Sequence, residues 1–199
     1  MKKIIIIIVL SIVTSCKTDS NAETELEQNI ESSEENQIES KNAKAMILPK
    51  FNSVKEMLLD ANDFSEEKNT LKFISTDINS LHVQVSKPIL QEDLESVKEE
   101  IVKRDIVYVA FQAFAQTDIN EITVTAVPVE YDDYKKYVNA HKLTIKINRE
   151  KAKNILQKYL QSTDFSILYE YQNNLWLPGK NFSILKFEKL NSVFNDMLH

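Results

Sequence analysis

The chain has 199 residues, 43% of them apolar, and a formal net charge of −6, which predicts one folded domain with a tail rather than two domains. No segment after residue 16 has the basic excess that phosphate neutralisation requires, so we expect no nucleic-acid partner. The single glycine, Gly179, excludes glycine-rich phosphate loops, dinucleotide fingerprints and nucleophile elbows, because these need residues without a Cβ.

Residues 1–15 have the features of a signal peptide. Lys2 and Lys3 form a short basic start, and residues 4–13 are apolar except for Ser11. A membrane-spanning helix needs about 20 apolar residues. The shorter run therefore predicts the apolar region of a signal peptide rather than a membrane span.

Residues 13–16, Val-Thr-Ser-Cys, resemble the lipobox of bacterial lipoproteins, in which an aliphatic and two small residues precede an invariant cysteine. Val13 stands where leucine is commoner. The resemblance implies that Cys16 is the lipidation site, carrying diacylglycerol and often a further acyl chain such as palmitate. Two or three acyl chains anchor a protein stably, at about 0.8 kcal/mol per buried methylene. The alternatives are an ordinary signal peptide that contains a cysteine and an uncleaved anchor.

The resemblance also bears on localisation. In Gram-negative lipoproteins an aspartate after the cysteine commonly causes retention in the inner membrane, and this chain has Lys17 there. The resemblance therefore implies a lipid anchor in the outer membrane of the cell envelope. It leaves open whether the domain faces the periplasm or the cell surface.

Residues 16–45 are expected to be the lipidated cysteine and a disordered acidic tether. Residues 17–44 contain three lysines, eight acidic residues and no aromatic residue, proline or glycine. Such a segment cannot offset its ordering entropy by burying apolar surface. A calcium site or a basic partner is the alternative explanation for its acids.

Residues 46–199 are expected to form a single globular domain. Its first half predicts a helix over residues 54–60, capped by Asn52-Ser53, and strands over residues 71–75 and 81–86. A long helix over residues 91–116 follows. Its apolar residues recur at three- and four-residue intervals, and its second half is apolar on more than one face.

The second half predicts strands over residues 122–130 and 141–147, with Pro128 placing the first at an edge or a bulge. A helix over residues 149–160 follows. In residues 165–171 every second residue is aromatic or aliphatic, which predicts a fifth strand. After a type II turn at Pro178-Gly179, the last helix covers residues 183–198. Its predicted apolar stripe consists of Phe187, Leu190, Phe194 and Met197.

The order ββαββα predicts an α+β fold with helices packed on one face of a mostly antiparallel sheet of four to five strands.

Few residues suggest catalysis or metal binding. His82, His141 and His199 have no second histidine or cysteine three or four residues away, so we expect no metal site and no cofactor. Two Ser-x-x-Lys stretches, residues 65–68 and 183–186, match one motif of penicillin-interacting enzymes. The Ser-Asp-Asn and Lys-Thr-Gly partners of that motif are missing from the chain.

Two aromatic groups are candidates for partner binding. Tyr131, Tyr134 and Tyr137 fall between two predicted strands, and tyrosines are favoured in interfaces. Their alternative is the packed stripe of a short helix. Trp176, beside two leucines, is the second candidate, with packing in the core or a loop as its alternative.

Together these features predict a lipid-anchored lipoprotein whose domain binds or scaffolds an envelope protein or a small ligand without catalysis. An inhibitor or immunity-type protein that blocks one envelope-acting protein would have the same features. A hydrolase is the third hypothesis, and it requires a nucleophile and a base that only the fold brings together.

Replacing the cysteine of the lipobox tests whether the protein is lipid-anchored. We expect Cys16→Ser to abolish palmitate labelling and to release the domain from the membrane fraction, because no acyl chain can then be attached. Metabolic labelling followed by fractionation measures both effects. Lys17→Ser, which keeps the thiol, is the control and should still be labelled. A wild-type protein that takes up no label would contradict the prediction.

Overall fold

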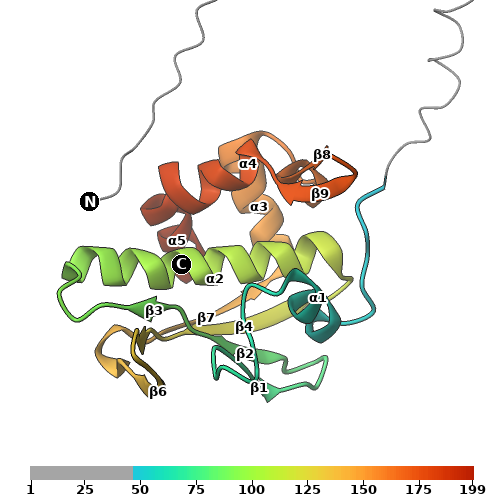
Figure 1. Ribbon diagram of the computed structural model, residues 1–199. Helices are drawn as coiled ribbons and strands as arrows, with labels where there is room; N and C mark the ends of the chain where they lie inside the picture. Colours follow the sequence, from blue (N-terminus) through green and yellow to red (C-terminus); the bar gives the residue numbers. More distant parts are fainter. Residues whose placement is uncertain (1–46) are drawn as a thin grey trace, which may run out of the picture. The chain divides into compact units, whose positions relative to one another are not determined.

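Helices packed on a four-stranded mixed sheet make up the part of the chain that the computed structural model describes, residues 47–199 (Figure 1). The predicted signal peptide, the lipidation site Cys16 and the acidic tether lie outside the described residues. Among the described helices, none combines the length and the apolar character needed to cross a bilayer.

The main sheet confirms the predicted fold class. It contains, in spatial order, β1 (Leu71–Ser75), β2 (His82–Val85), β4 (Glu121–Ala126) and β7 (Leu143–Asn148). The outer pairs β1–β2 and β4–β7 are antiparallel, and the central pair β2–β4 is parallel. A parallel pair needs a crossover connection, and the helix α2 (Glu95–Gln116) supplies it. With α3 (Arg149–Leu160) after β7, the order is ββαββα.

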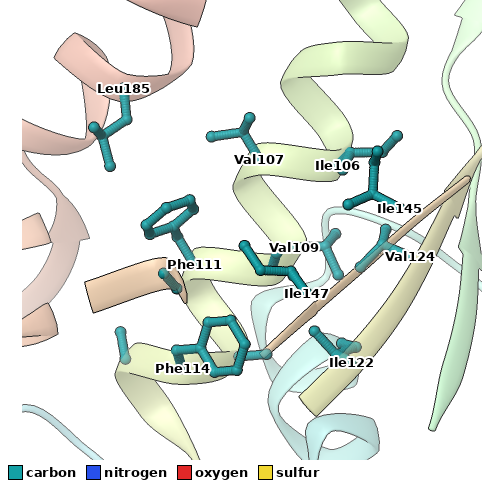
Figure 2. Close-up of a cluster of buried hydrophobic side chains, with 14 of the residues drawn as sticks. Ile106, Val107, Val109, Phe111, Phe114, Ile122, Val124, Ile145, Ile147 and Leu185 are labelled. Atoms are coloured by element: carbon teal, nitrogen blue, oxygen red, sulfur yellow. The ribbon is translucent and has the colours of Figure 1, made fainter. Parts of the chain in front are cut away.

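One face of the main sheet is apolar and packs against α2. In β2, Val83 and Val85 are fully buried, while His82 and Gln84 lie on the opposite, more accessible face. β4 and β7 add further apolar residues to the same face: Ile122, Val124, Ile145 and Ile147 (Figure 2). The predicted half-buried strands are therefore confirmed. Their alternation of apolar and polar residues matches the two-residue period of the pleat.

α2 is covered on a second side by the C-terminal helices. These are α4 (Lys180–Ser183), the π-helical segment η5 (Ile184–Glu188) and α5 (Leu190–Leu198). Ile106 and Val109 lie toward the sheet, whereas Phe111 lies toward Leu185 of η5 (Figure 2). This double coverage explains why the second half of α2 is apolar on more than one face.

The first turn predicted for α2 is not helical. The carboxylate of Asp93 accepts a hydrogen bond from the Leu90 N–H at 2.8 Å, and the Asp93 N–H donates to the Leu90 carbonyl at 3.3 Å. These bonds hold residues 90–93 in a turn. The helix therefore begins at Glu95 rather than at Gln91.

A single arginine caps the other end of α2. The guanidinium of Arg149 donates hydrogen bonds to the carbonyls of Phe114, Thr117 and Ile119 at 2.7–2.9 Å. It also lies 5.2 Å from the ring centre of Phe114 and 5.5 Å from that of Phe165. A positive charge at a helix C-terminus satisfies carbonyls that have no partner within the helix. Arg149 thus joins α2, the loop before β4 and the start of α3.

The strand predicted over residues 122–130 is interrupted at Val127-Pro128. Its second part is β5 (Val129–Glu130), which pairs with β3 (Pro88–Ile89) and with β6 (Asp133–Tyr137) in a small separate sheet. β4 is a central strand, so the edge position, one of the two placements predicted for Pro128, is wrong. The other placement, a bulge, agrees with the register shift between Val129 and Glu130. Pro128 is tolerated because it stands in the break, where no ladder hydrogen bond is required of it.

The fifth strand predicted over residues 165–171 is wrong in its first half. Residues Phe165–Leu168 form the 3₁₀ turn η4, because the Asp164 carboxylate accepts the Ser166 N–H at 2.9 Å. The rest belongs to β8 (Tyr169–Gln172), which pairs with β9 (Leu175–Pro178) in a separate hairpin.

The type II turn predicted at Pro178-Gly179 is also wrong. Gly179 has a φ of −89° and precedes α4, whereas Asn173 and Asn174 of the hairpin turn have the positive φ values. A Cβ at Gly179 would lie 2.6 Å from the Glu170 side chain, whose carboxylate accepts the Lys180 N–H at 2.9 Å. The glycine therefore permits a close approach rather than a special backbone angle.

Two helical predictions and one strand prediction are refined. α1 (Val54–Ala61) begins at the predicted cap, where the Ser53 hydroxyl accepts the Glu56 N–H at 3.1 Å. His141 ends the short turn η3 (Asn139–His141), and the following strand starts only at Leu143. The predicted apolar stripe of the last helix is wrong at Phe187, which is 52% exposed, because η5 interrupts the regular helix.

Removing the three-carbonyl cap should destabilise the fold. Arg149→Lys keeps the charge, but an ammonium cannot reach three divergent carbonyls as the guanidinium does. We expect a loss of about 2–3 kcal/mol in the free energy of unfolding, since a hydrogen bond to a charged group contributes about 1.5–3 kcal/mol. Urea denaturation of the full chain carrying Cys16→Ser measures it.

Arg104, the only other arginine in the sequence, is the matched control. It donates one hydrogen bond, to the Glu100 carbonyl at 3.2 Å, so Arg104→Lys should cost less than about 0.5 kcal/mol. Equal losses for the two variants would contradict the role assigned to Arg149.

Candidate functional site

A stripe of polar side chains runs along the buried part of α2. Asp105, Tyr108, Gln112 and Gln116 are spaced by three or four residues, which places them on one face of the helix. Asp105, Gln112 and Gln116 are buried. The prediction that this half of α2 is apolar on more than one face did not include the stripe, although its three- and four-residue spacing is visible in the sequence.

Three members of the stripe have hydrogen-bond partners. The Tyr108 hydroxyl donates to the Asp63 carboxylate at 2.6 Å. The Gln116 side-chain oxygen accepts from the Tyr169 hydroxyl at 3.2 Å and from the Gln112 amide at 3.4 Å. Burial, followed by the hydrogen bond to Asp63, raises the pKa of Tyr108, so this hydroxyl stays protonated and acts as a donor.

Asp105 is the exception. Its residue is 9% exposed, and within residues 47–199 its carboxylate has no hydrogen-bond or ion-pair partner. Burial raises the pKa of Asp105 to about 7, against the opposing attraction of Lys87, Lys186 and Arg104. Desolvation exceeds the attraction of these cations, because burial penalises the ionised form of a carboxyl group.

Asp105 lines a cleft of about 300 Å³, here called the Asp105 cleft. The lining residues are Lys87, Pro88, Ile101, Arg104, Asp105, Lys186 and Phe187. They come from α2, from η5, and from the start of β3 with the residue before it. Segments with π-helical hydrogen bonding are frequent at functional sites, and here η5 contributes Lys186 and Phe187.

The three cations of the cleft are held by aromatic rings and carbonyls rather than by Asp105. Lys186 Nζ lies 4.5 Å from the ring centre of Tyr108, and Arg104 Cζ lies 5.5 Å from that of Phe187. Lys87 Nζ donates to the Asp63 carbonyl at 3.0 Å. Burial lowers the pKa of Lys186. The lining thus has more positive than negative groups, in a partly dehydrated setting where charges interact strongly.

The cleft offers charged groups and hydrogen-bond donors. Its described lining contains no serine, cysteine or histidine. Ser183, the serine of one Ser-x-x-Lys stretch, is exposed and does not line it. Lys186 of that stretch does line the cleft, where its charged neighbour is Asp105. These lining groups can hold a charged ligand by hydrogen bonds and ion pairs.

The three candidate tyrosines do not form one surface. Tyr134 and Tyr137 belong to the strand β6, so the short helix considered for them is wrong. Residues three apart in a strand point to opposite faces. The Tyr137 hydroxyl donates to the Asn69 carbonyl at 2.8 Å, while the exposed Tyr131 lines a separate cleft beside Leu90. Partner binding by these residues stays a prediction.

Trp176 of β9 is partly buried. It packs against the core and lies edge-on to Tyr171, with 5.5 Å between ring centres. Its neighbours Leu175 and Leu177 are the exposed apolar residues on the other side of the hairpin. A partner-binding role for Trp176 stays a prediction.

The two described histidines inside the fold have protein partners. His82 Nε2 lies 2.8 Å from the Thr125 hydroxyl oxygen, and His141 Nε2 lies 3.1 Å from a carboxylate oxygen of Glu95. Burial and Lys142 lower the pKa of His82. In residues 47–199, no three His, Cys, Asp or Glu side chains come together as metal ligands would.

Comparison with known proteins adds no relative: no protein-family model, curated protein or solved structure matches the chain.

The raised pKa of Asp105 predicts a pH-dependent stability. The unfolded carboxyl titrates near pH 4 and the folded one near pH 7. The folded state therefore binds more protons between these values, and this group lowers stability as the pH rises from 4 to 7. Asp105→Asn cannot ionise. The variant should gain stability relative to wild type over this window, by up to a few kcal/mol at pH 8.

Urea denaturation at several pH values between 4 and 8 measures this difference. Asp60→Asn, the same change at an exposed position of α1, is the control and should show a nearly constant difference from wild type. A stability difference for Asp105→Asn that does not change with pH would contradict the assignment.

Proposed function

We propose that the protein is a lipid-anchored binding protein of the cell envelope, whose domain holds a small charged ligand in the Asp105 cleft without catalysis. The observation that carries the proposal is the buried Asp105 carboxylate, which lacks a protein partner although three cations line the same cleft. Leaving a buried charge unpaired lowers the stability of a fold. Such groups concentrate at functional sites.

The N-terminal sequence supports the anchor. The resemblance of residues 13–16 to a lipobox, after a basic start and a short apolar run, favours lipidation at Cys16. Lys17 favours the outer membrane. A tether of about thirty residues between the lipid and the domain would leave the cleft accessible to small molecules in the surrounding compartment.

The composition of the cleft supports binding over hydrolysis. A hydrolase that uses a hydroxyl or thiol nucleophile needs a base in hydrogen-bond reach of it, and the described lining consists of lysines, an arginine, a carboxyl group and apolar residues, with no serine, cysteine or histidine. Charged groups with an adjoining aromatic ring are the elements from which small-ligand sites are commonly built.

Native mass spectrometry tests the proposal. Protein extracted from envelopes in mild detergent should carry a small-molecule adduct, and Lys186→Met should lose it because one of the three cations is removed. Lys189→Met is the matched control, since Lys189 is exposed and does not line the cleft. No adduct on the wild-type protein, or an adduct equally retained by Lys186→Met, would contradict the proposal.

A further inference from the structure

The Asp105 cleft also indicates which charge its ligand carries. Building on the proposed function, we propose that the ligand is a small organic anion. Its carboxylate or phosphate is held by Lys87, Arg104 and Lys186, and an apolar part packs against Phe187.

The charge of the lining favours an anion. Three cationic side chains from three different segments line the cleft, against the single carboxylate of Asp105. An excess of positive charge therefore remains even when Asp105 is ionised. Guanidinium and ammonium groups form their strongest hydrogen bonds with carboxylate and phosphate oxygens. Within residues 47–199 no acidic residue forms an ion pair with any of these three cations. The N–H donors that they do not use on carbonyls can therefore meet a ligand.

The apolar part of the lining favours an organic anion over an inorganic one. Phe187 is half-exposed, and Ile101 and Pro88 line the same cleft. The cleft volume of about 300 Å³ lies at the lower end of the range for small-molecule sites. It accommodates a charged head group with a short chain rather than a folded segment of a partner protein.

Asp105 links the binding of an anion to a proton. The protonated carboxyl can donate its O–H to an anion, whereas the ionised form repels it. The charged groups that face Asp105 are Lys87, Lys186 and Arg104, which favour ionisation, and Asp63, which disfavours it. An anion that enters adds a second negative neighbour and favours the protonated form. Affinity for an anion should then increase as the pH falls through 7, by at most tenfold per pH unit.

Four compounds that share a six-carbon chain test the inference by their head groups. Hexanoate and hexyl phosphate carry the two anionic groups, hexylamine carries a cation, and 6-aminohexanoate is a zwitterion. Isothermal titration calorimetry of the full chain with Cys16→Ser should detect hexanoate or hexyl phosphate and not hexylamine. The stronger of the two anions identifies the head group.

The pH dependence is measured with hexanoate, which stays ionised between pH 6 and pH 8. Its affinity should increase about five- to tenfold from pH 8 to pH 6 if one group near pH 7 takes up the proton. Asp105→Asn retains a hydrogen-bond donor without a charge, so it should bind hexanoate with no such pH dependence. Lys186→Met should weaken binding about tenfold or more, and Lys189→Met should not change it.

Several results would overturn the inference. An affinity for hexanoate that increases with pH would contradict the proton link to Asp105. Preferential binding of hexylamine or 6-aminohexanoate would show that the ligand brings a positive group to Asp105. In that case the proposed binding function would stand. If neither anion binds at about 10 mM, the weak end of specific affinity, the inference is wrong even where an adduct is found. If the adduct is also missing, the proposed function fails with it.

Discussion

The position of α2 between two apolar layers is the constraint on which the rest of the domain depends. A helix that contacts a sheet on one side and other helices on the opposite side must be apolar on both. The side chains from Ile106 to Phe114 meet this requirement (Figure 2). Both neighbouring layers bury their apolar surface on this one helix. The Arg149 guanidinium closes the C-terminal end of α2, where three carbonyls would otherwise lack partners.

The same constraint gives the polar stripe its significance. A helix buried on two sides has little room for polar groups, and most of those in the stripe bond to each other or to Asp63 and Tyr169. Asp105 departs from this pattern, and it does so where α2 passes the π-helical segment and the residues after β2. The cleft, its cations and its unpartnered carboxylate thus coincide at one end of a network whose other members are hydrogen-bonded, apart from the buried side-chain oxygen of Gln112.

Local patterns predicted the fold well and the site poorly, for identifiable reasons. The alternation around Val83 and Ile145 predicted strands because half-burial in a pleated sheet imposes a two-residue period. Alternation also occurs at Phe165 and Ile167, but there the Asp164 carboxylate binds a nearby N–H and forms a 3₁₀ turn instead.

The cleft could not be predicted from local patterns at all. Lys87 and Lys186 lie far apart in the sequence and meet only through the packing of η5 beside α2. A sequence pattern shows which residues share one element, whereas a site assembled from three elements depends on how those elements pack. Asp105 itself is recognisable only as a member of a helical stripe, and its lack of a partner is a property of the tertiary structure.

The π-helical turn η5 makes the residues before and after it face different parts of the domain. The buried residues Leu185 and Leu190 are five positions apart, one more than a regular helix accommodates on a single face. The additional residue turns Lys186 and Phe187 toward the cleft, while α5 keeps its own apolar face on the core. Loss of one residue from this turn would rotate the side chains of α5 about the helix axis by about 100°. The wall of the cleft and the packing of α5 therefore cannot be altered independently of each other.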